Sequence, residues 1–222
     1  SLFTMAIGFP MPILLALLIN EVKNARFKKI IQNITYIPNF LSVVVIVSML
    51  TLFSNRDYGL FNKLTGIFGI EAVDFMSKPS FFQPLYVFSN VWQFMGFNAI
   101  IYIAALSGVD QELYEAASID GASRMQKIIH ISIPCIMNTI LILFIMRIGS
   151  LMSVGFEKVY LMQNSVTISA SEVISTFIYK NGIQKGQFSY STAVGMFNSV
   201  INFILLVSAN FVSRKTAKTS LW

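Results

Sequence analysis

Polar side chains within long apolar stretches are the residues of this sequence best placed to act on a solute. Arg147 lies in the middle of one such stretch, and Ser150 follows at i+3 on the same helical face. Asn198 and Asn202 align at i, i+4 in the last stretch. In a bilayer these side chains are costly unless they face protein or a water-filled cavity. They are therefore candidates either for lining a polar path or for joining helices, and Arg147 could instead pair with a helix carbonyl.

A further apolar stretch carries amide and aromatic side chains together. Trp92, Gln93 and Phe97 lie close to one another along it. Amides supply the paired donors and acceptors that sugar hydroxyls need, and aromatic rings stack on the C–H faces of a sugar. The set therefore suits a carbohydrate, although polar residues in membrane helices also join helices to one another.

No set of residues predicts catalysis or metal binding. His130 and Cys135 are the only residues of their types, so we expect neither a Cys/His zinc site nor a Ser-His-Asp or Cys-His arrangement. The nucleotide-binding pattern G-x-x-x-x-G-K-[ST] does not occur. We therefore expect no catalytic residue, no metal ligand and no cofactor bound by this chain.

The composition is that of a membrane protein. Of the 222 residues 55% are hydrophobic and 12% are charged, and the mean hydropathy is +0.68, whereas soluble domains carry about twice that share of charge. The net charge of +6 could indicate nucleic-acid binding, but Lys and Arg cluster at the ends of apolar stretches. We therefore attribute the charge to orientation in a membrane and expect no nucleic-acid partner.

Five apolar stretches are long enough to cross a bilayer, which takes about 20 helical residues. The sequence therefore predicts an all-α, polytopic helical bundle that forms one domain over 1–222. Pro10 and Pro12 should kink the first helix. The predicted spans are approximately 1–20, 34–53, 85–109, 135–156 and 191–212.

The basic residues predict an orientation for these spans. Lys and Arg concentrate between the first two spans, in the loop 110–134 and after the last span, so these regions are expected in the cytoplasm. Strict alternation then places Ser1 outside, and at least one earlier helix is expected before it. The outer segment 170–180 has apolar residues at helical spacing, which predicts a short helix on the membrane surface or packed on the protein.

The loop 110–134 contains signals for two short helices. Asp110 can cap the first, and Gly121 suits the left-handed conformation that ends it. Ser123 can cap the second, which Pro134 should stop because proline disfavours helical geometry at the preceding residue. Since proline fits the first turn of a helix, Pro134 should also open the next span.

This loop is similar to the EAA signature of permeases of binding-protein-dependent ABC importers, written E-A-A-x3-G-x9-I-x-L-P. The one departure is Ile133 for leucine, which preserves an apolar residue. The resemblance implies a coupling helix that docks in a groove of an ATPase subunit, with the alanines allowing close docking, the glutamate meeting a basic partner and the glycine setting the turn. The alternative is that Glu-Ala-Ala is merely helix-forming sequence. The matching residues are Glu115, Ala116, Ala117, Gly121, Ile131 and Pro134.

A longer resemblance covers nearly the whole chain. Through 20–38, 147–157 and 221–222 it looks like carbohydrate permeases of the lipoprotein-associated oligosaccharide type. Those permeases have six helices, so the first would be missing here, in agreement with the alternation of spans. The resemblance implies a multi-pass protein of the bacterial cytoplasmic membrane. Its implied partners are a second homologous permease, a dimer of ABC ATPase subunits that bind ATP and magnesium in place of this chain, an extracytoplasmic substrate-binding protein, membrane lipid and an oligosaccharide.

Three other functions remain open at this point. The EAA signature is shared across substrates, so the chain could be an ABC permease for a non-sugar solute. An ion-coupled secondary transporter should carry intramembrane carboxylates, and no Asp or Glu lies well inside a predicted span. A membrane-bound enzyme lacks a candidate catalytic set. The sequence therefore favours an importer permease that forms half of a carbohydrate pathway.

Overall fold

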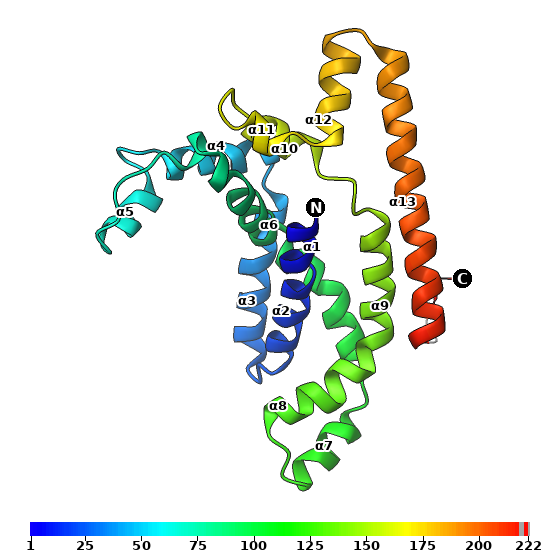
Figure 1. The fold of residues 1–222 in the computed structure, drawn as a ribbon. Coiled ribbons are helices and arrows are strands. Elements are labelled where there is room, and N and C mark those ends of the chain that lie inside the picture. The colour runs from blue at the N-terminus through cyan, green and yellow to red at the C-terminus, as the bar shows by residue number, and fades with distance from the viewer. Residues whose placement is uncertain (218–219, 222) are drawn as a thin grey trace. The chain divides into compact units, whose positions relative to one another are not determined.

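The computed structural model describes residues 1–217 and 220–221, and every regular element among them is a helix (Figure 1). This confirms the predicted all-α class. Most elements are α-helices, with short 3-10 and π-helical turns between them. The α-helices are α1 (Leu2–Gly8), α2 (Pro10–Asn20), α3 (Ala25–Tyr36), α4 (Val43–Ser54), α5 (Leu60–Gly66), α6 (Pro79–Ser107), α7 (Gln111–Ile119), α8 (Arg124–Lys127), α9 (Ile133–Gly149), α10 (Phe156–Met162), α11 (Ile168–Ser171), α12 (Ile174–Tyr179) and α13 (Phe188–Ala217). The 3-10 helices are η1 (Ile37–Phe40) and η2 (Phe75–Ser77), and the π-helices are η3 (Ile128–Ser132) and η4 (Lys180–Gln184).

Several helical segments are long and apolar enough to cross a membrane. Within the described residues there are 4 such segments, and a broken pair of helices is a fifth candidate. This number agrees with the predicted polytopic bundle. The segments are Leu2–Asn20, Pro79–Ser107, Arg124–Gly149 and Phe188–Lys215, and the broken pair is Ala25–Phe40 with Val43–Ser54.

The second predicted span is not one continuous helix. Helix α3 passes into the 3-10 turn η1, and α4 starts only at Val43. Pro38 within η1 has no N–H to donate, which interrupts the α-helical hydrogen-bond pattern. Ser42 restarts the helix because its hydroxyl accepts the backbone N–H of Val45 at 3.3 Å. The prediction of an uninterrupted helix over 34–53 is therefore wrong.

The first span is interrupted at the prolines that were expected to disturb it. Helix α1 ends at Gly8 and α2 begins at Pro10. Phe9 between them keeps right-handed helical angles, φ −79° and ψ −47°, and its N–H still donates to the carbonyl of Met5 at 3.0 Å. The first span is therefore interrupted only around Phe9.

The fourth span begins and ends earlier than the predicted 135–156. Helical structure runs from Arg124 to Gly149 without a break. At its end the N–H of Ser150 donates to the carbonyl of Arg147 at 3.3 Å, and the chain then leaves the helix. Glycine has low helix propensity, which favours termination there even though apolar residues such as Leu151 and Met152 follow.

The chain divides into two compact units. Unit 1 comprises Leu41–Asn90 and Leu151–Asn202 together with Ser1. Unit 2 comprises Leu2–Phe40 and Val91–Ser150 together with the segment that begins at Phe203. Helices α6 and α13 each contribute their first part to unit 1 and their second part to unit 2.

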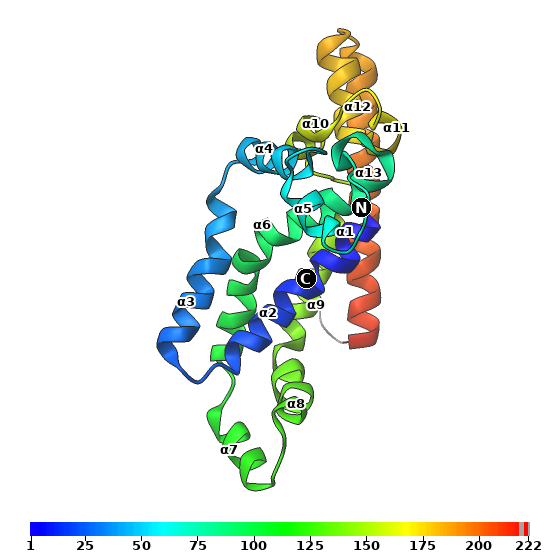
Figure 2. The same cartoon turned by 90° about the vertical axis from the view of Figure 1, so that its left-hand side faces the viewer.

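The core of unit 2 is built mainly from α2, α6 and α9. Two of its members, Ala16 and Ala99, are 0% exposed, and small side chains of this kind let membrane helices approach closely. An added Cβ at Gly96 of α6 would overlap the backbone of Thr35 of α3, so these two helices also cross at short distance. Figure 2 shows α2 and α3 joined by a short turn at one end. The core residues are Ala16, Leu17, Ala99, Tyr102, Leu106, Val109 and Ile136.

Buried amides hold the loops of unit 1 together. Asn62 is 8% exposed, and its Nδ2 donates to the carbonyls of Asn55 and Val73 at 2.8 Å each. Its Oδ1 accepts the N–H of Val73 at 2.9 Å. Asn164 makes a similar tie, because its Nδ2 donates to the carbonyl of Met76 at 2.8 Å. These bonds fix the loop around α5 and the 3-10 turn η2.

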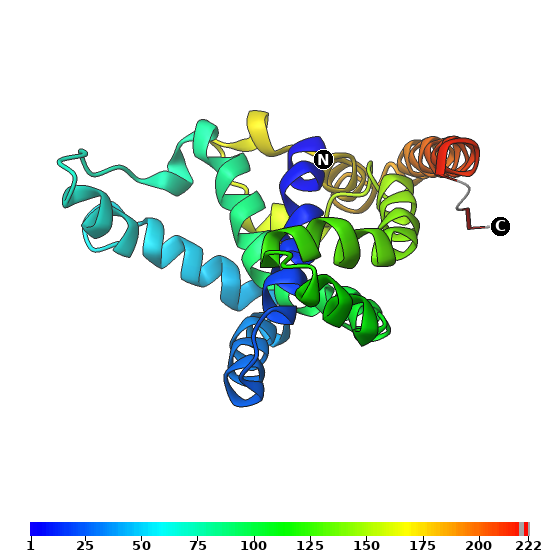
Figure 3. The ribbon, with the colours of Figure 1, turned by 90° about the horizontal axis from the view of Figure 1, so that it is seen from below.

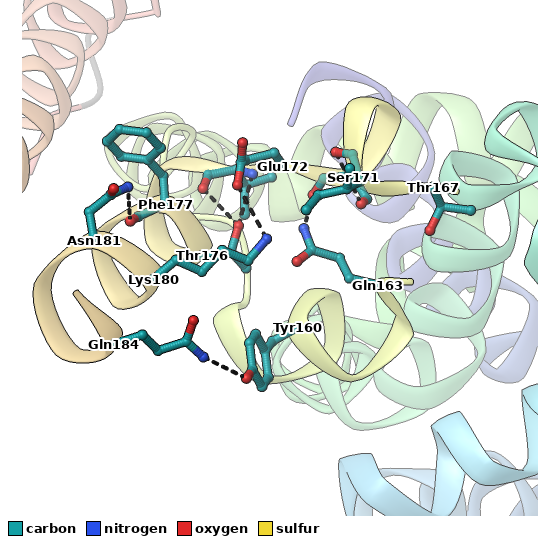
Figure 4. Close-up of polar contacts among 12 residues, drawn as sticks. Tyr160, Gln163, Thr167, Ser171, Glu172, Thr176, Phe177, Lys180, Asn181 and Gln184 are labelled. Carbon is teal, nitrogen blue, oxygen red and sulfur yellow. Dashed lines mark hydrogen bonds and ion pairs between the residues drawn. The ribbon is translucent and has the colours of Figure 1, made fainter. Parts of the chain in front are cut away.

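The outer segment 170–180 forms two short helices instead of the single helix predicted. The backbone of Glu172 is extended, with φ −68° and ψ 126°, and separates α11 from α12. Its carboxylate pairs with the ammonium of Lys180 at 3.2 Å, so the ion pair links the two ends of α12 (Figure 4). Gln163 of the preceding loop donates through Nε2 to the carbonyl of Ser171 at 2.9 Å. Side-chain contacts therefore order this segment on unit 1.

Candidate functional site

Helix α7 begins at the cap that the sequence predicts. The carboxylate of Asp110 accepts the backbone N–H of Glu112 at 3.0 Å, and Glu112 adds a negative charge to the first turn. On one side of the helix Tyr114 is half-buried and packs against the core of unit 2. Tyr114 therefore attaches α7 to the core of unit 2. Figure 1 shows α7 next to α8 at one end of unit 2.

One exposed stripe of α7 is apolar. Leu113 is 47% exposed and Ile119 86% exposed, and Ala116 lies between them at i+3 from each. The carboxylate side chain of Glu115 is exposed as well, while Ala117 is partly buried. Exposed apolar side chains around a small residue permit close approach by the backbone of a second protein.

A glycine turn ends α7, as the sequence predicts. Gly121 has φ +77° and its N–H donates to the carbonyl of Ser118 at 3.2 Å. The N–H of Ala122 donates to the carbonyl of Ala117 at 2.8 Å, which completes the hydrogen-bond pattern of a Schellman motif. A Cβ at position 121 would meet nothing within 4 Å, so backbone conformation alone favours glycine here.

Ser123 caps the second helix, again as predicted. Its hydroxyl accepts the N–H of Gln126 at 3.4 Å, and the side chain of Gln126 accepts the N–H of Ser123 at 2.7 Å. This reciprocal pair is a capping box. Because both helix ends are capped, the connection between α7 and α8 is short and well defined; Figure 3 views this end of unit 2.

Pro134 does not stop the second helix, contrary to the prediction. The chain passes through the π-helical turn η3, and Ile133 keeps helical angles of φ −64° and ψ −49°. The N–H of Ile133 donates to the carbonyl of Ile128, five residues back. The wider π turn lets the helix continue although the proline nitrogen has no hydrogen to donate. Pro134 itself is exposed, whereas Ile131 packs partly buried against the core of unit 2.

Arg147 lies in the last turn of α9 and not in the middle of a span, as the sequence had suggested. The helix ends at Gly149, and the side chain of Arg147 is exposed. Ser150 lies outside α9 and donates its hydroxyl to the carbonyl of Arg147 at 3.1 Å. A basic side chain at a helix C-terminus complements the helix dipole and can reach the membrane interface.

Asn202 joins a helix to a loop. Its Oδ1 accepts the N–H of Met152 at 3.1 Å, and its Nδ2 donates to the hydroxyl of Ser153 at 3.0 Å. The structure thus gives Asn202 the joining role that the sequence left as an alternative. Asn198 lies one turn away on α13, and its buried Oδ1 has no hydrogen-bond partner among the described residues.

The amide and aromatic residues of α6 do not share one surface. Gln93 is 2% exposed and belongs to the interior of unit 2. Trp92 and Phe97 are 46% and 45% exposed, and the ring of Phe97 meets that of Phe40 edge-on at 6.4 Å. Only the two aromatic side chains are therefore available to a molecule outside the chain in this conformation.

Lys158 is a buried cation that sequence reasoning missed. It is 5% exposed on α10, and its ammonium lies 6.0 Å from the ring centroid of Tyr86. Burial lowers the pKa of Lys158 to about 8, because removal from water disfavours the charged form. One signal was available in the sequence, since the apolar residue Met162 lies at i+4 on the same helical face.

The described residues offer recognition surfaces but no reactive cluster. They contain no group of three or more His, Cys, Asp or Glu side chains that could hold a metal ion. The exposed face of α7 can dock a protein, and Arg147 supplies a positive charge at the end of a membrane helix. Both features therefore suit the binding of a partner protein or a solute to this chain.

The sequence is similar to those of known transport proteins. The sequence model of a family described as "Binding-protein-dependent transport system inner membrane component" matches residues 8–218. The polygalacturonan/rhamnogalacturonan transport system permease protein YteP of Bacillus subtilis is 43% identical over 98% of this chain and 68% of its own length. Protein LplB of the same organism is 43% identical over 97% of this chain and 68% of its own length.

Solved structures are similar over the same extent. A chain of a bacterial alginate ABC transporter, in complex with a periplasmic protein bound to an alginate pentasaccharide, matches with a TM-score of 0.95 and 39% identity. The match covers 99% of this chain and 76% of that chain. A chain of a bacterial ABC transporter that imports the acidic polysaccharide alginate matches with a TM-score of 0.93.

Proposed function

Since this chain belongs to the family of inner-membrane components of binding-protein-dependent transport systems, we propose that it is the permease subunit of an ATP-driven carbohydrate importer. It forms half of the translocation pathway for an oligosaccharide in the bacterial cytoplasmic membrane. The names of its relatives support this substrate class, because they include transporters of polygalacturonan, rhamnogalacturonan and alginate. Alginate is acidic, so acidic oligosaccharides are the first substrates to test.

The exposed face of α7 is the observation that carries the proposal. Leu113 and Ile119 are exposed on the same helical face on either side of Ala116, and adjoining exposed apolar side chains of this kind mark an interaction surface. We assign that place to the ATPase subunit, with Ala116 and Ala117 allowing close contact and Glu115 meeting a basic residue. Gly121 sets the direction of the turn.

The two remaining residues of the EAA signature support α7 from the segment that leads into α9. Ile131 packs against the core of unit 2, and Pro134 lies at the start of α9 directly after the π turn. We propose that Ile131 and Pro134 transmit movement of α7 to helix α9.

We propose fewer residues for contact with the solute than the sequence alone suggested. Arg147 and Ser150, at the exposed end of α9, are candidates for contacting a passing glycan, and Trp92 and Phe97 offer aromatic faces. Asn198 remains a candidate because its buried carbonyl oxygen has a free acceptor site within the described part of the chain. Gln93 and Asn202 act chiefly through the packing and loop contacts described above.

The proposal requires three protein partners. They are a second homologous permease, a dimer of ATPase subunits that bind ATP and magnesium, and an extracytoplasmic binding protein that delivers the oligosaccharide. A chain similar to this one was solved in complex with a periplasmic protein, which supports the last of these. A permease for a non-sugar solute is the alternative, since the docking face of α7 does not specify the cargo.

Purification from the native membrane tests the partners directly. The full chain is isolated under mild detergent and its bound proteins are identified by mass spectrometry. We expect an ATPase subunit and a second permease in stoichiometric amounts, and a lone oligomer without ATPase would contradict the proposal.

Reconstitution then tests the cargo. Proteoliposomes that contain the purified complex and its binding protein should hydrolyse ATP faster with oligoalginate or oligogalacturonate than with maltooligosaccharides of equal length. Stimulation by a peptide or an amino acid, and by none of these glycans, would favour the non-sugar alternative.

A further inference from the structure

Two side-chain contacts join α7 to the segment that leads into α9. The phenol oxygen of Tyr114 and the hydroxyl oxygen of Ser132 lie 2.9 Å apart, across 18 positions of sequence. The ammonium of Lys127 donates to the hydroxyl of Ser118 at 2.6 Å. The same Ser118 hydroxyl donates to the carbonyl of Tyr114 at 2.6 Å, so the two contacts form one connected set.

The contact between Tyr114 and Ser132 is the stronger of the two. Ser132 is 1% exposed, and the ring of Tyr114 packs against the buried core of unit 2. Loss of the Tyr114 hydroxyl would leave the buried hydroxyl of Ser132 without a replacement from bulk water. The pair formed by Lys127 and Ser118 is exposed, and solvent can substitute for it at little cost.

This contact bypasses the glycine turn that connects α7 to α8. The backbone connection between α7 and α8 turns at Gly121, whose φ of +77° is a conformation that glycine can leave easily. A force applied to α7 could therefore be absorbed by that turn. A bond from Tyr114 to Ser132 reaches past the turn to the residue directly before α9.

Ser132 also lies at a distinctive point of the helix. It is the last residue of the π turn η3, and the N–H of the next residue reaches back five positions. π turns of this kind occur as single insertions in α-helices, frequently at functional positions. A side-chain contact at this point acts on the first turn of α9.

We infer that the contact between Tyr114 and Ser132 is a brace. It makes α7, the helix proposed to dock on the ATPase, and the membrane helix α9 move as one rigid body. The inference rests on the proposed function and adds to it two positioning residues that lie outside the EAA signature's matched positions. Neither residue needs to touch the ATPase or the solute. Their role is to prevent the turn at Gly121 from dissipating the movement of α7.

Conservative variants test the brace in the complete complex. Tyr114→Phe and Ser132→Ala each remove one hydroxyl, and Ser132→Thr keeps it. We expect each removal to lower the number of oligosaccharides transported per ATP by about fivefold, the equivalent of one hydrogen bond. The double variant should match the single variants instead of multiplying their effects, and Ser132→Thr should retain coupling.

Matched controls remove the same groups elsewhere. Tyr58→Phe removes a phenol that is on an exposed side chain of unit 1, and Ser107→Ala removes a hydroxyl that bonds only within its own helix, to the carbonyl of Ile103. Both should leave the coupling ratio within twofold of the unmodified complex.

Hydrogen exchange separates the brace from the proposed function. In Tyr114→Phe the amides of α7 should exchange several-fold faster, whatever the cargo. Unchanged exchange would overturn the brace itself, and faster exchange with an unchanged coupling ratio would overturn its role in transmission. Absence of ATPase stimulation in the unmodified complex would instead contradict the proposed function.

Discussion

Substitutions at Gly121 should impair coupling in an order set by backbone conformation. The residue has φ +77°, and a Cβ there would meet nothing within 4 Å. Steric clashes with neighbours are therefore excluded, and the cost of a side chain is that of the left-handed conformation, about 1–2 kcal/mol for an ordinary L-residue. Asparagine tolerates this conformation better than alanine.

Proline should be far worse than alanine at this position. Its ring holds φ near −65°, which is incompatible with +77°. It also removes the hydrogen bond from the N–H of Gly121 to the carbonyl of Ser118. These effects together should exceed about 3 kcal/mol.

The assay is a titration of the ATPase subunit against the reconstituted permease, followed by uptake of labelled oligosaccharide. A penalty of 1–2 kcal/mol weakens the apparent affinity by about 5- to 30-fold. We therefore expect Gly121→Asn to remain close to wild type, Gly121→Ala to lose about fivefold or more in affinity, and Gly121→Pro to insert in the membrane but not to transport.

Gly69 provides the matched control. It has φ +73° and a Cβ there would also meet nothing within 4 Å, but it belongs to the loop after α5 in unit 1. Gly69→Ala should cost similar local stability and leave ATPase affinity unchanged. Full transport by Gly121→Pro, or equal loss with Asn and Pro, would refute the conformational argument.

Three further substitutions test the structure of the two units. Gly96→Ala should lower the melting temperature by several degrees because the new Cβ meets the backbone of Thr35, an overpacking cost of about 1–3 kcal/mol, whereas Gly66→Ala, in open space, should not. Asn202→Leu should lower thermal stability more than glycan affinity, and the opposite result would return it to the solute pathway. Lys158 has its pKa lowered to about 8, so the native state loses this proton before the unfolded state does. The stability of the wild type relative to Lys158→Met should therefore rise from pH 8 to pH 10, and a constant difference would contradict the buried charge.

Short-range signals in the sequence were the reliable ones. Asp110, Gly121 and Ser123 take the capping and turn roles that their types predict. Each role depends on a backbone group within three residues, so the local sequence contains all the participants. The all-α class followed in the same way from the length of the apolar stretches.

Predictions that relied on averaged hydropathy were less accurate. The break at Pro38 and the early end of α9 at Gly149 both fall inside stretches whose residues are predominantly apolar. Arg147 was consequently placed in mid-span, although it lies in the last turn of its helix. Pro134 failed as a stop signal because the π turn before it changes the hydrogen-bond register, which no residue type announces.

The sequence by itself determined that the chain is a helical membrane protein with a capped glycine turn in one loop, because apolar length and capping act locally. Only the tertiary structure decided which face of each helix packs against another helix. The contact of Tyr114 with Ser132, the close crossing at Gly96 and the burial of Lys158 depend on helices distant in sequence. A single sequence gives the composition of each helical face but not the partner that the face meets.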